Sequence, residues 1–128
     1  MKKFLKLCFL LFGFVLLQSS LHSQSVNLKS LQDVQLLNVQ NCAVVQVNAS
    51  WNYQNRVRIE QLDKLCYIAQ VDIENKDIGA IIVKEWDIDI VPTIIVLKNG
   101  VEIKRFEPGI SMSFDERTII ESIRQEVR

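Results

Sequence analysis

The chain has 128 residues, with 15 basic and 15 acidic side chains, 48% hydrophobic residues and a single histidine. Basic and acidic residues alternate along the sequence, so no basic stripe indicates nucleic acid as a partner. The one imidazole, His22, lies in a segment that we expect to be removed, which argues against nucleophilic catalysis by a Ser-His-Asp or Cys-His system. Without it we expect no metal site, and no motif indicates a cofactor.

Residues 1–25 have the pattern of a secretory signal peptide. Three lysines precede an apolar run from Leu7 to Leu17, and small polar residues continue to Ser25. The apolar run is about half of the ~20 residues that a membrane-spanning helix needs, so we expect no stable membrane anchor after cleavage. The leader holds 3 of the 15 basic residues and no acids, which leaves 12 basic residues against 15 acidic ones. We predict an exported protein, either periplasmic or secreted.

Residues 26–128 read as one domain in which strands and helices alternate. In chain order we predict a strand at 26–28, a helix from 31 to about 40, a strand at 43–48, a short helix at 53–65, a strand at 66–73, a helix at 78–86, strands at 93–97 and 101–106, and a final helix after Ser113. Long connections between the early strands and one late hairpin predict an α/β fold, with a central mixed β-sheet flanked by helices.

Local signals refine these elements. Ser30 is placed to cap the first helix. The pair Asn99-Gly100 predicts a tight hairpin turn, because both central positions of such a turn need positive φ. Ser113 and Glu116 form a capping-box pattern at the start of the last helix. In residues 85–90 acids alternate with apolar residues, and we interpret this segment as a solvated, strand-like edge instead of a metal site.

Two segments carry a resemblance to a known family. Residues 49–55, Ala-Ser-Trp-Asn-Tyr-Gln-Asn, follow a β-branched strand, and residues 90–93, Ile-Val-Pro-Thr, lie further along the chain. Together with Trp51, Pro92 and a glycine after the last strand, Gly109, this order resembles the thioredoxin family over the whole predicted domain. The resemblance implies a thioredoxin-like fold, in which the first segment is the active-site turn and the second is the cis-proline loop that faces it.

The same resemblance places Asn52 and Asn55 where the family has the cysteines of its Cys-x-x-C motif. An amide can neither ionise nor form a mixed disulfide, so dithiol exchange at this turn is chemically excluded. Gln46 and Gln70 stand where the family has a buried acid and a lysine. We expect these two amides to bond each other across adjacent strands in a neutral network. The site is therefore predicted to be redox-inactive.

The cis-proline face remains as a candidate binding site. In the family, the backbone of the residue before the proline, here Val91, pairs with an extended segment of a partner and needs no thiol. The alternative is that the turn itself requires the proline. Trp51 is either an exposed anchor for a partner or a ring packed against the sheet edge. The predicted binding face comprises Trp51, Asn52, Tyr53, Asn55, Val91, Pro92 and Gly109.

Two cysteines, Cys42 and Cys66, begin adjacent strands in this alignment. They form either a structural disulfide in an oxidising compartment or two small buried hydrophobic residues. We predict an exported module that binds a protein or an extended peptide segment. The alternatives are a weak thiol-disulfide oxidoreductase or isomerase that uses Cys42 or Cys66, and a structural subunit of an envelope assembly.

Overall fold

A computed structural model provides the structure of the protein. It describes residues 25–109 and 114–128. The predicted signal peptide, apart from Ser25, and the predicted helix cap at Ser113 lie outside these residues. Within the described ranges, no helix is both long and apolar enough to cross a lipid bilayer.

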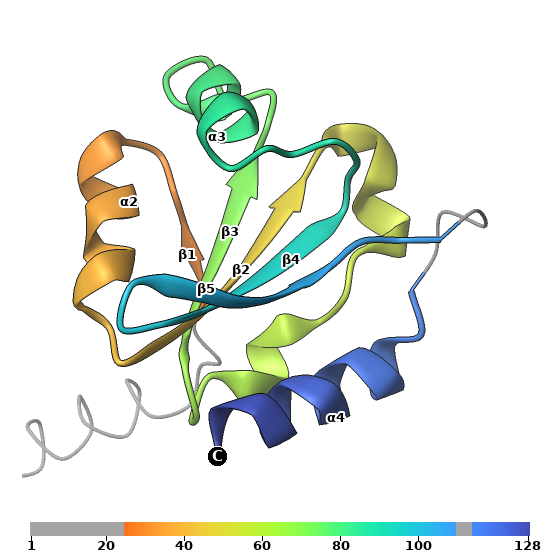
Figure 1. Cartoon of the computed structure of the whole chain (residues 1–128). Coiled ribbons are helices and arrows are strands. Elements are labelled where there is room, and N and C mark those ends of the chain that lie inside the picture. The colour runs from red at the N-terminus through yellow and green to blue at the C-terminus, as the bar shows by residue number, and fades with distance from the viewer. Residues whose placement is uncertain (1–24, 110–113) are drawn as a thin grey trace, which may run out of the picture.

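A five-stranded sheet forms the centre of the domain (Figure 1). Its spatial order is β1-β3-β2-β4-β5, with β1 at Val26–Asn27, β2 at Cys42–Asn48, β3 at Tyr67–Asp72, β4 at Thr93–Lys98 and β5 at Val101–Phe106. Strands β1, β3 and β2 are parallel, whereas β4 runs antiparallel to both β2 and β5. The predicted α/β fold with a mixed sheet flanked by helices is confirmed.

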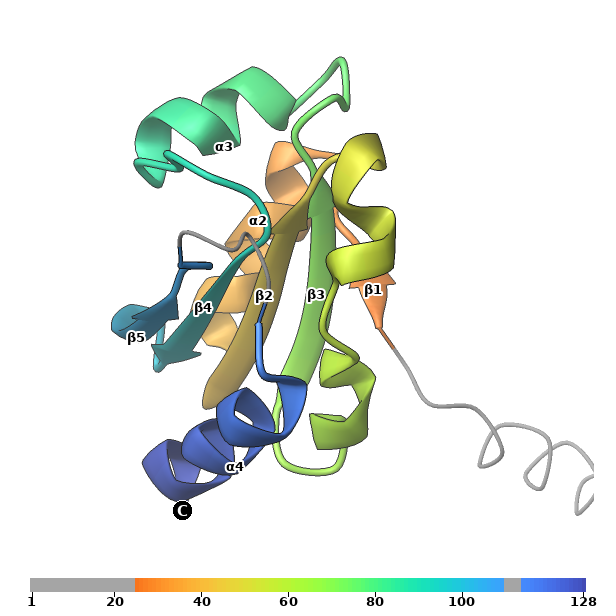
Figure 2. The ribbon, with the colours of Figure 1, turned by 90° about the vertical axis from the view of Figure 1, so that its right-hand side faces the viewer.

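Helices cover both faces of this sheet. One face packs against α2 (Leu31–Leu36) with its following turn η1 (Leu37–Val39) and against α3 (Gly79–Glu85), and the other packs against the turn η3 (Ile59–Leu62) and α4 (Glu116–Val127). In both views α3 and α4 lie at opposite ends of the molecule (Figure 2). Because successive side chains of a strand point to opposite faces, β2 contributes Val45 and Val47 to one core cluster and Val44 to the other.

The predicted helix at 53–65 is wrong. Two short 3₁₀ turns replace it, η2 (Ser50–Asn55) and η3, with an irregular connection between them. Gln46 on β2 accounts for the break. Its Nε2 donates to the carbonyl oxygen of Val57 at 2.7 Å, and its Oε1 accepts from the N–H of Val57 at 2.8 Å. The N–H of Val57 is thus bonded to a strand residue, and its carbonyl oxygen also accepts from the N–H of Ile59 at 2.9 Å. Neither bond is the i→i−4 bond of an α-helix, so the helical hydrogen-bond ladder is broken at this residue.

Two predicted boundary signals can be compared with the structure. The hairpin between β4 and β5 turns at Asn99 and Gly100 as predicted, with φ of 53° and 81°. Gly100 is also tightly placed, because a Cβ there would lie 3.2 Å from the backbone oxygen of Asn38. At α4 the cap is Asp115, two residues later than predicted. Its carboxylate accepts from the N–H of Thr118 at 3.4 Å and from the Thr118 hydroxyl at 2.9 Å.

Candidate functional site

The turn η2 follows the carboxyl end of β2 and directs two neighbouring side chains to opposite environments. Trp51 is 69% exposed, whereas Asn52 is only 3% exposed. The Oδ1 of Asn52 accepts from the N–H of Ala49 at 2.5 Å, and its Nδ2 donates to the Oδ1 of Asn48 at 3.0 Å. Contrary to the expectation from the sequence, the Asn52 side chain closes the turn from the inside and is not presented to a partner.

The other predicted residues of this face differ in their surroundings. Asn55 is exposed at the end of η2, so the two asparagines at the cysteine positions do not share one environment. The side chain of Tyr53 lies outside the described part of the structure. Gly109, beyond the end of β5, is exposed, with open space where a Cβ would stand. Trp51 is thus the described aromatic side chain that this turn presents to solvent.

A chain of side-chain contacts runs from Asn52 across the ends of β2 and β3. Asn48 Nδ2 donates to Gln70 Oε1 at 2.8 Å, and Gln70 Nε2 donates to Glu60 Oε1 at 3.3 Å. Glu60 is also paired with Arg56 at 3.3 Å. The network therefore ends on an ion pair. The prediction of a neutral network, which was based on the two glutamines alone, is wrong in this respect.

The predicted contact between Gln46 and Gln70 is weak. Their amide groups are 3.5 Å apart, because the short hydrogen bonds of Gln46 go to the backbone of Val57. Among the described residues, every buried side-chain nitrogen or oxygen has a hydrogen-bond partner. The amides at these two strand positions thus hold the chain after the turn and also tie β2 to β3.

The loop before β4 lies beside this turn. The strand register pairs Thr93 with Val47 near the end of β2, and the peptide bond between Val91 and Pro92 is cis. Thr93 Oγ1 donates to the carbonyl oxygen of Ile90 at 2.6 Å. Within the described ranges, neither the N–H nor the C=O of Val91 has a hydrogen-bond partner. As a whole residue Val91 is only 7% exposed.

A groove of about 260 Å³ opens between the turn and the loop. It is lined by residues from η2, the end of β3, α3 and the segment before β4: Trp51, Ile73, Val83, Ile88, Asp89, Ile90 and Val91. The structure thus brings together two residues of the predicted binding face, Trp51 and Val91. The predicted residues that do not line the groove are Asn52, Asn55, Pro92 and Gly109.

Sequence reasoning missed the groove wall formed by α3 and the segment that follows it. Asp87 has a φ of 50°, and Arg105 of β5 donates to the carbonyl oxygens of Trp86 at 2.8 Å and of Asp87 at 3.1 Å. This clamp turns the chain sharply after α3. The interpretation of residues 85–90 as strand-like is therefore wrong, because α3 ends at Glu85 and a turn follows it. The three acids of this segment are exposed, as expected.

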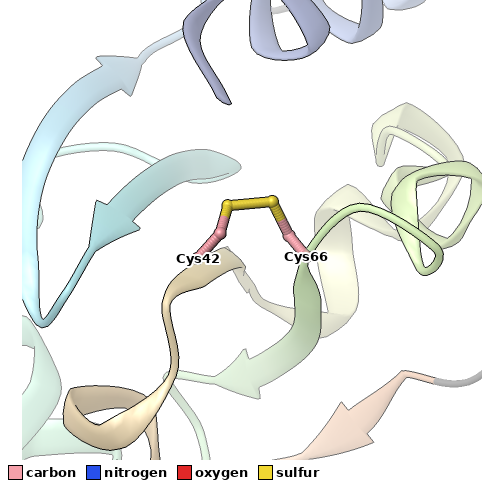
Figure 3. The surroundings of a disulfide bond; sticks show 2 residues. All are labelled: Cys42 and Cys66. Carbon is pink, nitrogen blue, oxygen red and sulfur yellow. A yellow bond between two sulfur atoms is a disulfide. The ribbon is translucent and has the colours of Figure 1, made fainter. Parts of the chain in front are cut away.

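A disulfide joins Cys42 and Cys66 at the other end of the sheet (Figure 3). Their Cα atoms are 4.8 Å apart. Cys42 pairs with Lys98 at the end of β4 that lies farthest from Thr93, so the length of β2 separates the bridge from the groove. Of the two alternatives for these cysteines, the structure shows the bridge.

Comparisons with known proteins identify the fold. No protein-family profile matches the sequence, and no curated protein matches it. Among solved structures, a thioredoxin from Malassezia sympodialis matches with a TM-score of 0.67 at 16% identity, over 84% of this chain and 94% of that one. The oxidised thioredoxin O2 of Arabidopsis thaliana matches at 0.66 and 20% identity, over 83% and 96%. The thioredoxin of Fasciola hepatica matches at 0.61 and 23% identity, over 78% and 97%. At these identities the likeness concerns architecture, and the chain has a thioredoxin-like fold.

Proposed function

We propose that this chain is an exported protein without dithiol activity, which binds an extended protein or peptide segment. The observation that carries the proposal is the groove between Trp51 and Val91. Trp51 is exposed, and exposed aromatic side chains supply much of the energy at the centre of an interface. The backbone of Val91, which has no hydrogen-bond partner within the described residues, offers main-chain hydrogen bonds to a strand-like segment.

The chemistry at the turn supports binding without electron transfer. Asn52 and Asn55 carry carboxamides, which supply no thiolate for attack on a disulfide. Cys42 and Cys66 are joined to each other and lie at the far end of the sheet. With dithiothreitol as the electron source, we expect the protein to reduce insulin no faster than dithiothreitol alone. Clear turnover would overturn this half of the proposal.

Export is supported by two independent features. Residues 1–25 have the charge and apolar pattern of a secretory signal peptide, and disulfides such as Cys42–Cys66 persist mainly in oxidising compartments. The test is expression in an exporting host, followed by mass spectrometry of the protein from the periplasm or the medium. The expected product lacks the leader and is two mass units lighter than its dithiol form. A product that keeps the leader would contradict export.

Binding is tested by titrating synthetic extended peptides into the exported protein. In the variant Trp86→Phe, Trp51 is the remaining tryptophan and reports occupancy of the groove by its fluorescence. In calorimetry, Trp51→Ala is expected to weaken binding by about tenfold. The matched control is Leu65→Ala, which removes another exposed apolar side chain, next to Cys66. Equal effects of the two substitutions would contradict binding at the groove.

The rival function is thiol chemistry at Cys42 or Cys66. The double variant Cys42→Ala and Cys66→Ala distinguishes it from peptide binding at the groove. Its peptide affinity should equal that of the wild type, because the groove contains neither residue. Loss of binding in a variant that still unfolds cooperatively would favour a role for the cysteines.

A further inference from the structure

The groove contains one ionisable residue among those that line it, Asp89. Asp89 is exposed. Ion pairs join Arg56 with Glu60, Arg58 with Glu116 and Arg105 with Glu102, and none of these pairs includes Asp89. Its carboxylate also accepts no hydrogen bond from another described residue. The negative charge at this apolar groove is thus uncompensated.

Trp51 lines the same groove and is exposed. The face of an indole attracts cations, and the attraction is stronger for tryptophan than for the other aromatic side chains. An open indole and an unpaired carboxylate at one groove are chemically suited to a cation held between them. Arginine fits this arrangement better than lysine, since the planar guanidinium stacks on aromatic rings and donates two parallel hydrogen bonds to a carboxylate.

The size and lining of the groove indicate what accompanies the cation. Its volume of about 260 Å³ lies below the ~300–1,000 Å³ of pockets that enclose whole organic ligands. Ile73, Val83, Ile88 and Ile90 make the remaining walls apolar. The space therefore suits individual side chains of a longer segment, one of them apolar.

We propose that the groove selects extended segments in which an arginine is next to an apolar residue. The arginine stacks on Trp51 and pairs with Asp89, and the apolar side chain enters between Val83 and Ile88. This specificity rests on the proposed peptide-binding function. The negative charge of Asp89 attracts the arginine of such a segment and would repel an acidic segment.

The test uses four synthetic peptides, acetyl-Thr-Val-Xaa-Val-Thr-amide, with arginine, lysine, citrulline or glutamate at the central position. Citrulline keeps the shape of arginine and removes its charge. In calorimetric titration of the exported protein, we expect the arginine peptide to bind about three- to thirtyfold more tightly than the citrulline peptide. The lysine peptide should lie between them, and the glutamate peptide should bind most weakly.

Substitutions at Asp89 test whether this carboxylate is the group that binds the positive charge of the peptide. Asp89→Asn should make the arginine and citrulline peptides bind alike without weakening the citrulline peptide, and Asp89→Lys should favour the glutamate peptide. The control Glu126→Gln changes the net charge by the same amount from an exposed position on α4 and should preserve the order of affinities. Higher salt should reduce the preference for arginine.

The outcomes separate the two proposals. Equal binding of the arginine and citrulline peptides to the wild-type protein overturns the arginine specificity and leaves peptide binding intact. An arginine preference that survives Asp89→Asn also overturns it, because the cation would then be held elsewhere. If none of the four peptides binds, at concentrations up to the millimolar range, both proposals fail. Binding that changes only with the oligomeric state of the protein would show a second copy as the occupant and overturn the specificity.

Discussion

Replacing Gln46 by glutamate tests how the turn is held. Gln46 has no exposed surface; it donates to the carbonyl oxygen of Val57 and accepts from the N–H of the same residue. A protonated carboxyl group can make both hydrogen bonds, whereas a carboxylate keeps the acceptor and loses the donor. The lost donor costs about 1–3 kcal/mol, and desolvation of the charge adds at least as much. We therefore expect Gln46→Glu to lower the free energy of unfolding by roughly 3–5 kcal/mol at pH 7.

This loss depends on pH with a defined sign. Burial disfavours the ionised form, so the pKa of the introduced carboxyl group is raised in the folded protein above its ordinary value of about 4.3. The unfolded chain then loses its proton first. The destabilisation should be small below about pH 4, grow as the pH rises, and become constant above the folded-state pKa.

The assay is urea unfolding from pH 4 to pH 8, with the wild type measured at each pH. Gln46→Leu is the control, because it removes both hydrogen bonds at every pH. It should lower the free energy of unfolding by about 2–4 kcal/mol, nearly independently of pH. If the loss in Gln46→Glu were independent of pH, the reasoning would be refuted, since the carboxylate would then have to be solvated or supplied with another donor.

Three further predictions concern the disulfide, the surface charges and the hairpin. The bridge between Cys42 and Cys66 spans a sequence separation of 24, so replacing both by alanine should lower the free energy of unfolding by about 3.5 kcal/mol in urea unfolding; a loss under about 1 kcal/mol would contradict the loop-entropy account. The hydrogen bond from Arg58 is the main cause of the lowered pKa of Glu116, whose ordinary value is 4.5. The stability from this pair, in which the Arg58 side chain is largely exposed and that of Glu116 is half-buried, is thus present above pH 4.5 and lost as the pH falls through the lower folded-state pKa. Glu116→Gln should cost less than about 1 kcal/mol at pH 7 and progressively less in acid, and a cost that rises in acid would be inconsistent with this sign. Gly100→Ala at a φ of 81° should cost about 1–2 kcal/mol and lower the Tm, whereas an unchanged thermal scan would show that the hairpin relaxes.

The fold was predictable because its signals are local or periodic. Ser30 caps α2 as predicted, with its Oγ accepting from the N–H of Asp33 at 3.2 Å. The Asn99-Gly100 pair has the backbone conformation that its residue types favour. Strand β2 was recognisable from its β-branched residues, and the long early connections with one late hairpin indicated a mixed sheet. Each of these inferences depends on residues close together in the chain.

The site was less predictable because its determinants are long-range. The Gln46 clamp on Val57 joins residues 11 positions apart, and no pattern in residues 53–65 reveals that a strand residue interrupts the helix there. The burial of Asn52 depends on Asn48 and Ala49 at the end of the strand. The groove wall likewise depends on contacts from Arg105 to the end of α3. Sequence periodicity does not encode such contacts.

The two anchors of η2 have a consequence for engineering. Asn52 ties the start of the turn to the end of β2, and Gln46 fixes Val57 just after its end, so neither anchor uses the solvent-facing positions. Those positions can therefore be randomised as a cassette while the sheet and both anchors stay in place. The molecule is in this respect a compact scaffold for displaying variable recognition turns. Among the turn positions whose side chains the structure describes, the exposed ones are Ser50, Trp51, Gln54 and Asn55.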